Sequence, residues 1–334
     1  MAVANKDARA ATGIDADTLR AMYRHILRAR LLDERIWVLN RQGRARFWVS
    51  GIGHEAIQVA LGMSLRPGRD WVVPYYRDLA LSMVLGMTPR DHLLSALAKA
   101  ADPNTGGRQM PAHFSSRRLN VVSTGSSVAT QLLHATGVAL ATKIRGEDAV
   151  TATTVGEGGT SEGDFHEALN FAATRRLPVV FVVENNGYAI SVPTDRQMPT
   201  RDVADRAAGY GMPGVVVDGT DPIRSYRCCV EAVARARSGG GPTLIEAKVP
   251  RLTSHSSDDD HRRYRSEDDL EAERLHDCLS GFGRTLDELR VLTPRAAQAV
   301  RAELEAELDQ ATADAEQADD PPAETVGLHV LADR

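Results

Sequence analysis

An unbroken run of apolar residues at 179–183 constrains the fold of this chain more than any other feature. Such a run, which has no alternating polar positions, is typical of a strand buried on both faces of a parallel sheet. Further β-rich runs occur at 71–73, 149–155, 215–217 and 243–247. Helical patterns separate these runs, and the alternation predicts the α/β class, a parallel sheet covered by helices on both faces.

Apolar residues at helical spacing predict helices before, within and after this region. The expected helices span 16–42, 53–65, 77–85, 89–100, 128–144, 162–174, 202–208, 222–237, 266–279 and 294–315. Residues 102–126 follow no regular pattern, and a loop of that length in a compact domain is usually functional or disordered. We therefore predict a flexible segment at 1–15, a single domain at 16–320 with helical N- and C-terminal extensions, and a tail at 321–334.

Composition narrows the class of protein. The net charge of −5 gives no electrostatic reason to expect binding to nucleic acid. No apolar run is long enough to cross a bilayer, and the N-terminus lacks the apolar core of a secretion signal. The three cysteines have no CxxC spacing and fit a reducing compartment, so we predict a cytoplasmic protein.

A glycine-rich segment at 156–163 follows one predicted strand and opens a predicted helix. In such a turn, backbone N–H groups can approach a phosphate at the helix N-terminus. Glycine alone is weak evidence, because many strand-to-helix turns contain it. The segment has neither the Lys of a Walker A loop nor the spacing GxGxxG, and this argues against a nicotinamide-dependent reductase.

The next predicted strand ends in Glu184-Asn185-Asn186. If the two strands are neighbours in a parallel sheet, Glu157 and Asn186 lie together at its carboxyl edge. A carboxylate and an amide oxygen are hard ligands that suit octahedral Mg²⁺, and diphosphate oxygens and water can complete the coordination shell. The alternative is an ordinary turn beside a capped strand end.

Residues 156–186 resemble the thiamin-diphosphate motif, which begins Gly-Asp-Gly and ends Asn-Asn. The text GEGGTSEGDFHEALNFAA at 156–173 resembles the α subunit of 2-oxo acid dehydrogenase components more narrowly. The resemblance covers roughly residues 20–290 and implies the thiamin-diphosphate-binding fold, with thiamin diphosphate and Mg²⁺ as cofactors. It implies cofactor contacts at Gly156 and Gly158, and Mg²⁺ bound by Glu157, Asn186 and the carbonyl of Tyr188. Most thiamin enzymes have Asp where Glu157 stands, and the Glu is similar to branched-chain members.

The resemblance also assigns roles to residues outside the motif. Tyr76 and Arg77 would contact the diphosphate, although a surface ion pair is the alternative for Arg77. Ser126 and Val128 would contact the middle of the cofactor, with Val128 as an apolar wedge under the thiazolium. The family can bind K⁺ at the positions of Thr130 and Gln131. Branched-chain members commonly have proline where this chain has Ser127, and ordinary helix capping is the alternative here.

The resemblance to this family also concerns three histidines. His255 would be catalytic and would contact the cofactor, since imidazole can transfer a proton or bind phosphate near neutral pH; an ordinary solvated histidine is the alternative. Ser256, beside it, stands where mitochondrial relatives are phosphorylated. His113 lies in a loop that resembles the branched-chain form, with a structural role equally open. His54 is interpreted first as a packing or capping residue.

The implied activity is oxidative decarboxylation of a branched-chain 2-oxo acid, with reductive acylation of a lipoyl domain on an acyltransferase core. That is the reaction of a 3-methyl-2-oxobutanoate dehydrogenase in branched-chain amino acid catabolism. A β subunit would complete the active site in an α2β2 heterotetramer. Pyruvate or acetoin is the alternative substrate, and a degenerate subunit that only stabilises a partner is the non-enzymatic alternative.

Overall fold

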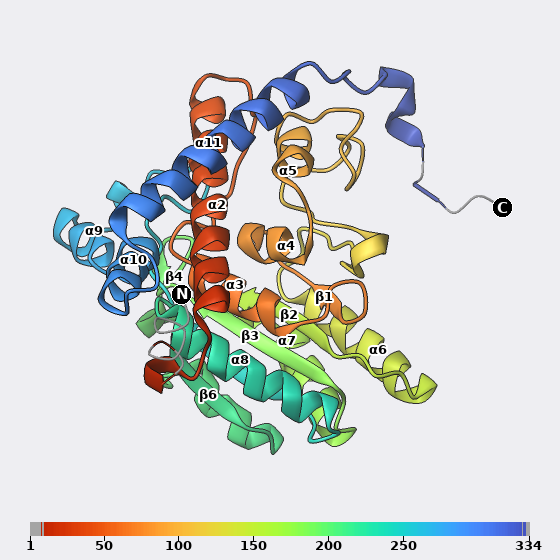
Figure 1. Cartoon of the computed structure of the whole chain (residues 1–334). Coiled ribbons are helices and arrows are strands. Elements are labelled where there is room, and N and C mark those ends of the chain that lie inside the picture. The colour runs from red at the N-terminus through yellow and green to blue at the C-terminus, as the bar shows by residue number, and fades with distance from the viewer. Residues whose placement is uncertain (1–7, 9, 329, 332–334) are drawn as a thin grey trace.

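A parallel five-stranded sheet in the order β1-β2-β3-β7-β6 forms the centre of the computed structural model, which describes residues 8, 10–328 and 330–331 (Figure 1). The strands are β1 (Trp71–Val73), β2 (Thr151–Gly156), β3 (Val179–Asn185), β7 (Thr243–Lys248) and β6 (Gly214–Asp218). A small antiparallel hairpin, β4 (Tyr188–Ala189) and β5 (Val192–Pro193), follows β3. The predicted α/β fold with a parallel sheet is confirmed.

Helices cover both faces of the sheet, and alternate residues of β3 belong to different cores. Val180 and Val182 pack with α3 (Glu55–Ser64) and α8 (Pro222–Arg237). Phe181 and Val183 pack on the opposite face with α6 (Thr130–Arg145) and α7 (Gly163–Thr174). The strand is buried throughout, as an uninterrupted apolar run requires.

The remaining helices build a layer outside α3, where the blue C-terminal helix crosses the red N-terminal one in Figure 1. They are α2 (Ala16–Arg41), α4 (Leu79–Leu85), α5 (Pro89–Ala96), α9 (Glu267–Arg274), α10 (Cys278–Glu288) and α11 (Pro294–Glu316). Short 3-10 helices lie at Arg117–Leu119, Glu157–Ser161, Thr194–Arg196, Val203–Tyr210, His261–Arg263 and Ala323–Gly327. The helix predicted at 202–208 is thus a 3-10 helix.

Several predicted helix boundaries are wrong for local reasons. The helix expected from residue 128 begins at Thr130, because Ala129 has a φ of 71°, which a right-handed helix cannot accommodate. The helix expected at 77–85 begins only at Leu79. The helix expected to reach residue 100 ends at Ala96, and Ala98 has a φ of 53°.

The single helix predicted at 266–279 is two helices. α9 ends at Arg274, and α10 begins at Cys278 and continues to Glu288. Asp277 causes the break, because its carboxylate accepts from the N–H groups of Leu279 and Ser280 and caps α10. The same carboxylate also accepts from Arg30 at 2.7 Å, so a contact with α2 holds the cap in place.

The predicted N- and C-terminal segments lie partly outside the described residues, namely at 1–7, 9, 329 and 332–334. Residues 10–12 are helical, and Ile14 is buried in the core that contains α2 and α3. At the other end, Arg108 donates to the carbonyl of Thr325 at 3.0 Å. In the part of the chain that the structure describes, no helix is long and apolar enough to cross a membrane.

A buried ion-pair cluster joins the helical extensions to the domain. Arg30 on α2 donates to Glu55 on α3 at 2.6 Å and to Asp277 before α10 at 2.7 Å. Glu55 also accepts from the N–H of Gly53 at 2.7 Å. The Arg30 and Glu55 side chains are 8% and 3% exposed, so removing one partner leaves the other charge uncompensated in the interior.

We predict that Arg30→Ala lowers the free energy of unfolding by roughly 3–5 kcal/mol, the usual cost of an uncompensated buried charge. Urea denaturation followed by circular dichroism measures the change. Arg24→Ala, which removes the exposed ion pair with Glu303 between α2 and α11, is the matched control and should have a much smaller effect. Equal effects of the two substitutions would contradict the structural importance of the buried cluster.

Candidate functional site

A cavity of about 440 Å³ lies at the carboxyl edge of the sheet and contains most of the predicted site residues. The predicted residues that line it are Tyr76, Arg77, Ser126, Val128, Gly156, Glu157, Gly158, Asn186, Tyr188 and His255. They come from five separate chain segments. The parallel register places the ends of β2 and β3 side by side, with Gly156 opposite Glu184.

Glu157 and Asn186 meet at this edge, as expected for neighbouring parallel strands. The N–H of Asn186 donates to Glu157 Oε2 at 3.2 Å, and the N–H of Tyr188 donates to Asn186 Oδ1 at 3.2 Å. Glu157 is 2% exposed, and its Oε1 has no hydrogen-bond partner. Burial raises the pKa of Glu157 above its ordinary value. A buried carboxylate oxygen without a donor, aimed at a cavity, is suited to hold a cation.

Arg77 also lines the cavity and is buried, with 2% of the residue exposed. Its Nη1 donates to the carbonyl of Ser50 at 2.5 Å, and its Nε has no partner. Burial acts to lower the pKa of Arg77, but neighbouring tyrosine and glutamate groups raise it above its ordinary value. Arg77 is therefore charged, and a surface ion pair, the alternative role, is excluded by its burial.

His255 lies against Arg77 and lines the cavity. Its Nδ1 is 3.3 Å from Nη2 of Arg77. Because a guanidinium only donates, Nδ1 must accept, and the ring hydrogen is on Nε2. Burial, together with the charges of Arg77 and Arg251, lowers the pKa of His255 to about 4. At neutral pH the ring is uncharged and offers an Nε2–H donor. The N–H of His255 donates to Asp259, and the neighbouring Ser256 is buried.

Val128 projects into the cavity from the turn before α6 and is 47% exposed. Because Ala129 is in the left-handed conformation, α6 does not extend back to Val128, and the valine is not part of the helix. Gly159 makes room for it, since a Cβ at that position would lie 2.8 Å from Val128 Cγ1. A larger residue at 159 would displace the valine.

Thr130 and Gln131 do not line the cavity. The hydroxyl of Thr130 donates to Asp164 at 2.7 Å, and the amide of Gln131 donates to the carbonyl of Thr154 at 2.9 Å. Gln131 therefore connects α6 to β2. The structure does not bring these two residues together with the other predicted ligands.

His113 lies in the cavity wall, where it forms a pair with Ser126. Its Nδ1 is 2.8 Å from the carbonyl of Met110, which can only accept, so Nδ1 carries the hydrogen. Nε2 then accepts from the hydroxyl of Ser126 at 2.8 Å. Sequence analysis left the role of His113 open, and the geometry shows that the ring holds Ser126 in the cavity.

The apolar part of the wall consists of Phe47, Val49, Met110, Pro111, Ala189 and Ile190. Met110 and Pro111 belong to the loop with His113 that resembles the branched-chain form, whereas no sequence signal marked the other four as wall residues. Phe47 and Val49 precede α3 in a segment without periodicity, and Ile190 lies in the β4–β5 turn. These residues make one side of the cavity suitable for an aliphatic group.

Fold and site together define an α/β protein with one acidic edge, one buried arginine and an apolar wall around the same cavity. The family model for the dehydrogenase E1 component matches residues 23–324, and the chain belongs to this family.

Individual relatives agree with that assignment. The chain is 48% identical over 297 residues to the 2-oxoisovalerate dehydrogenase subunit alpha of Bacillus subtilis, with 89% of this chain and 90% of the relative covered. It is 40% identical over 286 residues to the 3-methyl-2-oxobutanoate dehydrogenase subunit alpha of Mycobacterium tuberculosis, covering 86% of this chain and 75% of the relative. Identity to the pyruvate dehydrogenase E1 component subunit alpha of Bacillus cereus is lower, 35% over 303 residues, with 90% of this chain and 79% of the relative covered.

We predict that His255 does not titrate between pH 8 and pH 5, because its folded-state pKa is about 4. Two-dimensional NMR of the ¹⁵N-histidine-labelled chain should show the Nε2–H tautomer across this range. His255→Gln assigns the signal by its disappearance. A midpoint near the ordinary value of about 6.5 would contradict the burial of the ring against two arginines.

Proposed function

We propose that this chain is the α subunit of a thiamin-diphosphate-dependent branched-chain 2-oxo acid dehydrogenase. The observation that carries the proposal is the cavity that Glu157 and Arg77 share, in which Glu157 Oε1 lacks a partner and Arg77 is buried. These are complementary groups for a metal-bound diphosphate. The names of the two relatives from Bacillus subtilis and Mycobacterium tuberculosis support the same activity.

The residues present fit the cofactor. Glu157, Asn186 and the carbonyl of Tyr188 would hold Mg²⁺, and Arg77 would bind a diphosphate oxygen. Among the described residues no group of three His, Cys, Asp or Glu side chains could hold a metal. A site with one carboxylate thus depends on phosphate oxygens for the rest of its coordination shell, as Mg²⁺ sites at diphosphates usually do.

When bound, thiamin diphosphate supplies the nucleophilic carbon and the electron sink that decarboxylation of a 2-oxo acid requires. The chain's own residues would bind and orient it. Val128 would support the middle of the cofactor, and His113 holds Ser126 nearby. The neutral His255 would offer its Nε2–H to an anionic oxygen. We keep His255 as the proposed catalytic residue in this donor role.

Potassium at Thr130 and Gln131 remains a prediction. Both side chains are engaged in hydrogen bonds to other parts of the chain, at Asp164 and Thr154. Hydroxyl and amide oxygens retain acceptor capacity in these arrangements, so a K⁺ site requires no loss of the existing contacts.

A branched-chain substrate fits the apolar wall that Phe47, Val49 and Met110 contribute. A β subunit would complete the active site in an α2β2 assembly and supply the glutamate that activates the aminopyrimidine. A lipoyl domain would receive the acyl group, and we place the complex in the cytoplasm. Intact Glu157 and Arg77 argue against a degenerate subunit that only stabilises its partner.

We predict that Glu157→Ala weakens Mg²⁺-dependent binding of thiamin diphosphate by at least roughly 10–100-fold, since even residues behind metal ligands have effects of that size. Calorimetric titration of the complex with the β partner measures the dissociation constant. Glu167→Ala, an exposed substitution on the following helix, is the control. Unchanged affinity in Glu157→Ala would remove Glu157 from the site.

We predict that the complex decarboxylates 2-oxoisovalerate with a kcat/KM at least roughly tenfold higher than pyruvate, because a few additional methyl groups in an apolar pocket contribute about that factor. Assays with 2-oxoisovalerate, pyruvate and acetoin under identical conditions decide the matter. A clear preference for pyruvate or acetoin would overturn the substrate class without affecting the cofactor site.

A further inference from the structure

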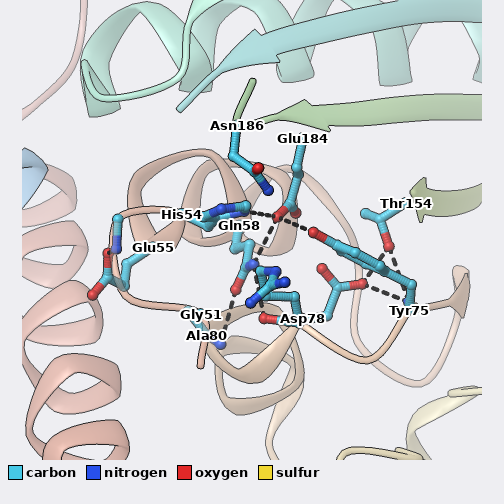
Figure 2. Close-up of polar contacts among 12 residues, drawn as sticks. Gly51, His54, Glu55, Gln58, Tyr75, Asp78, Ala80, Thr154, Glu184 and Asn186 are labelled. Carbon is cyan, nitrogen blue, oxygen red and sulfur yellow. Dashed lines mark hydrogen bonds and ion pairs between the residues drawn. The ribbon is translucent and has the colours of Figure 1, made fainter. Parts of the chain in front are cut away.

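A buried polar cluster lies directly behind the cavity wall, centred on the carboxylate of Glu184 (Figure 2). Its Oε2 accepts hydrogen bonds from His54 Nδ1 at 2.6 Å, Gln58 Nε2 at 3.0 Å and the Tyr75 hydroxyl at 3.0 Å. We call these residues, together with Asp78 and Thr154, the Glu184 network.

The network contains a second carboxyl group, that of Asp78, beside Glu184. Asp78 Oδ2 accepts from the N–H of Tyr75 at 3.0 Å and from the Thr154 hydroxyl. Asp78 Oδ1 and Glu184 Oε1 have no hydrogen-bond partner. Through its Oδ2, the residue that follows Arg77 is joined to Thr154 on β2 and to the backbone of Tyr75.

Gln58 connects this network to the turn that carries Arg77. The amide nitrogen of Gln58 donates to the carbonyl of Arg77 at 3.0 Å as well as to Glu184. Its amide oxygen accepts from the N–H of Ala80 at 3.1 Å. A single side chain, 1% exposed, thus holds the backbone on both sides of the turn.

The remaining connections lead to the metal edge. Glu184 lies near the end of β3, two residues before Asn186. Thr154 lies on β2, three residues before Glu157. Gln58, Asp78, His54 and Glu184 themselves do not line the cavity. An apolar cluster would pack α3 against the sheet without the cost of burying a charge. The polar groups instead fix the relative positions of three backbone segments, each of which presents a site residue.

We infer that Gln58, through its bonds to Glu184 and the Arg77 turn, and Asp78, through its bonds to Tyr75 and Thr154, are positioning residues that place Arg77 and Asn186 for the bound diphosphate and its metal. This inference rests on the proposed function. Beyond that function, it names residues that do not line the cavity but determine the affinity for the cofactor.

The first test is Gln58→Met, which keeps the volume and removes all three hydrogen bonds. We expect the dissociation constant for thiamin diphosphate with Mg²⁺ to rise roughly tenfold or more in the complex with the β partner. At saturating cofactor, kcat should return close to the wild-type value. Ser82→Ala, which removes buried hydrogen bonds on α4 away from the cavity, is the matched control and should leave the dissociation constant unchanged.

The second test compares two substitutions of Asp78. In Asp78→Asn the amide oxygen can still accept from the Tyr75 N–H and the Thr154 hydroxyl, so wild-type cofactor affinity is expected. Asp78→Leu loses these bonds and should resemble Gln58→Met. Tm measured without cofactor separates loss of folding from loss of positioning, because a purely structural role lowers Tm and leaves the affinity of the folded protein unchanged.

The outcomes distinguish the two levels of the argument. Absence of thiamin diphosphate binding by the wild-type complex would overturn the proposed function. Binding by the wild type, with equal dissociation constants in Gln58→Met and Asp78→Leu, would overturn the positioning role alone. Weakened binding in Asp78→Asn to the level of Asp78→Leu would overturn the role assigned to the bonds that Asp78 accepts from Tyr75 and Thr154.

Discussion

The parallel pairing of β2 with β3 is the constraint on which the rest of the site depends. It places Gly156 opposite Glu184, so the residues that follow each strand emerge at the same edge. Glu157 and Asn186 are 29 positions apart in the chain and still share a hydrogen bond. No local interaction could bring them together, and a shift of one residue in the register would turn each side chain to the other face.

Buried charge is the second constraint. Several of the buried ionisable groups lie around one cavity or directly behind its wall. Arg77 and Glu184 are fully enclosed and have opposite charges, whereas the carboxyl of Glu157 has an unpaired oxygen. The cavity is thus lined by a buried cation and by a buried carboxyl group with one oxygen that has no partner. A ligand that combines a divalent cation with phosphate oxygens is complementary to both groups at once.

Much of this could be predicted from sequence because it depends on periodicity and short motifs. The apolar strand at β3 and the segment around Glu157 were sufficient to predict the sheet and the meeting of Glu157 and Asn186 at its carboxyl edge. The start of α6 was not predictable, because the left-handed Ala129 has no residue-type signal, unlike glycine. The break before α10 depends on Asp277 meeting Arg30, which lies 247 positions away. Apolar wall residues such as Phe47 lack periodicity, and only the folded chain brings them to the cavity.

His54 was interpreted as a packing or capping residue, and this illustrates a further limit of sequence. It caps α3 only through its backbone position, since its side chain makes no cap hydrogen bond. The ring reaches instead to Glu184, a contact across 130 positions that no spacing rule contains. When a buried polar residue bonds to a partner far away in the sequence, the pairing can be identified only from the folded structure.

The first turn of α3 shows why the helical extensions bear on the site. Two consecutive residues there point in opposite directions, His54 toward Glu184 and Glu55 away from it (Figure 2). Glu55 is held by Arg30 of α2, which also binds Asp277 at the start of α10. Further along α3, Gln58 bonds to the backbone of the Arg77 turn. A continuous set of ion pairs and hydrogen bonds thus connects the outer helices, through α3, to the segment that carries Arg77.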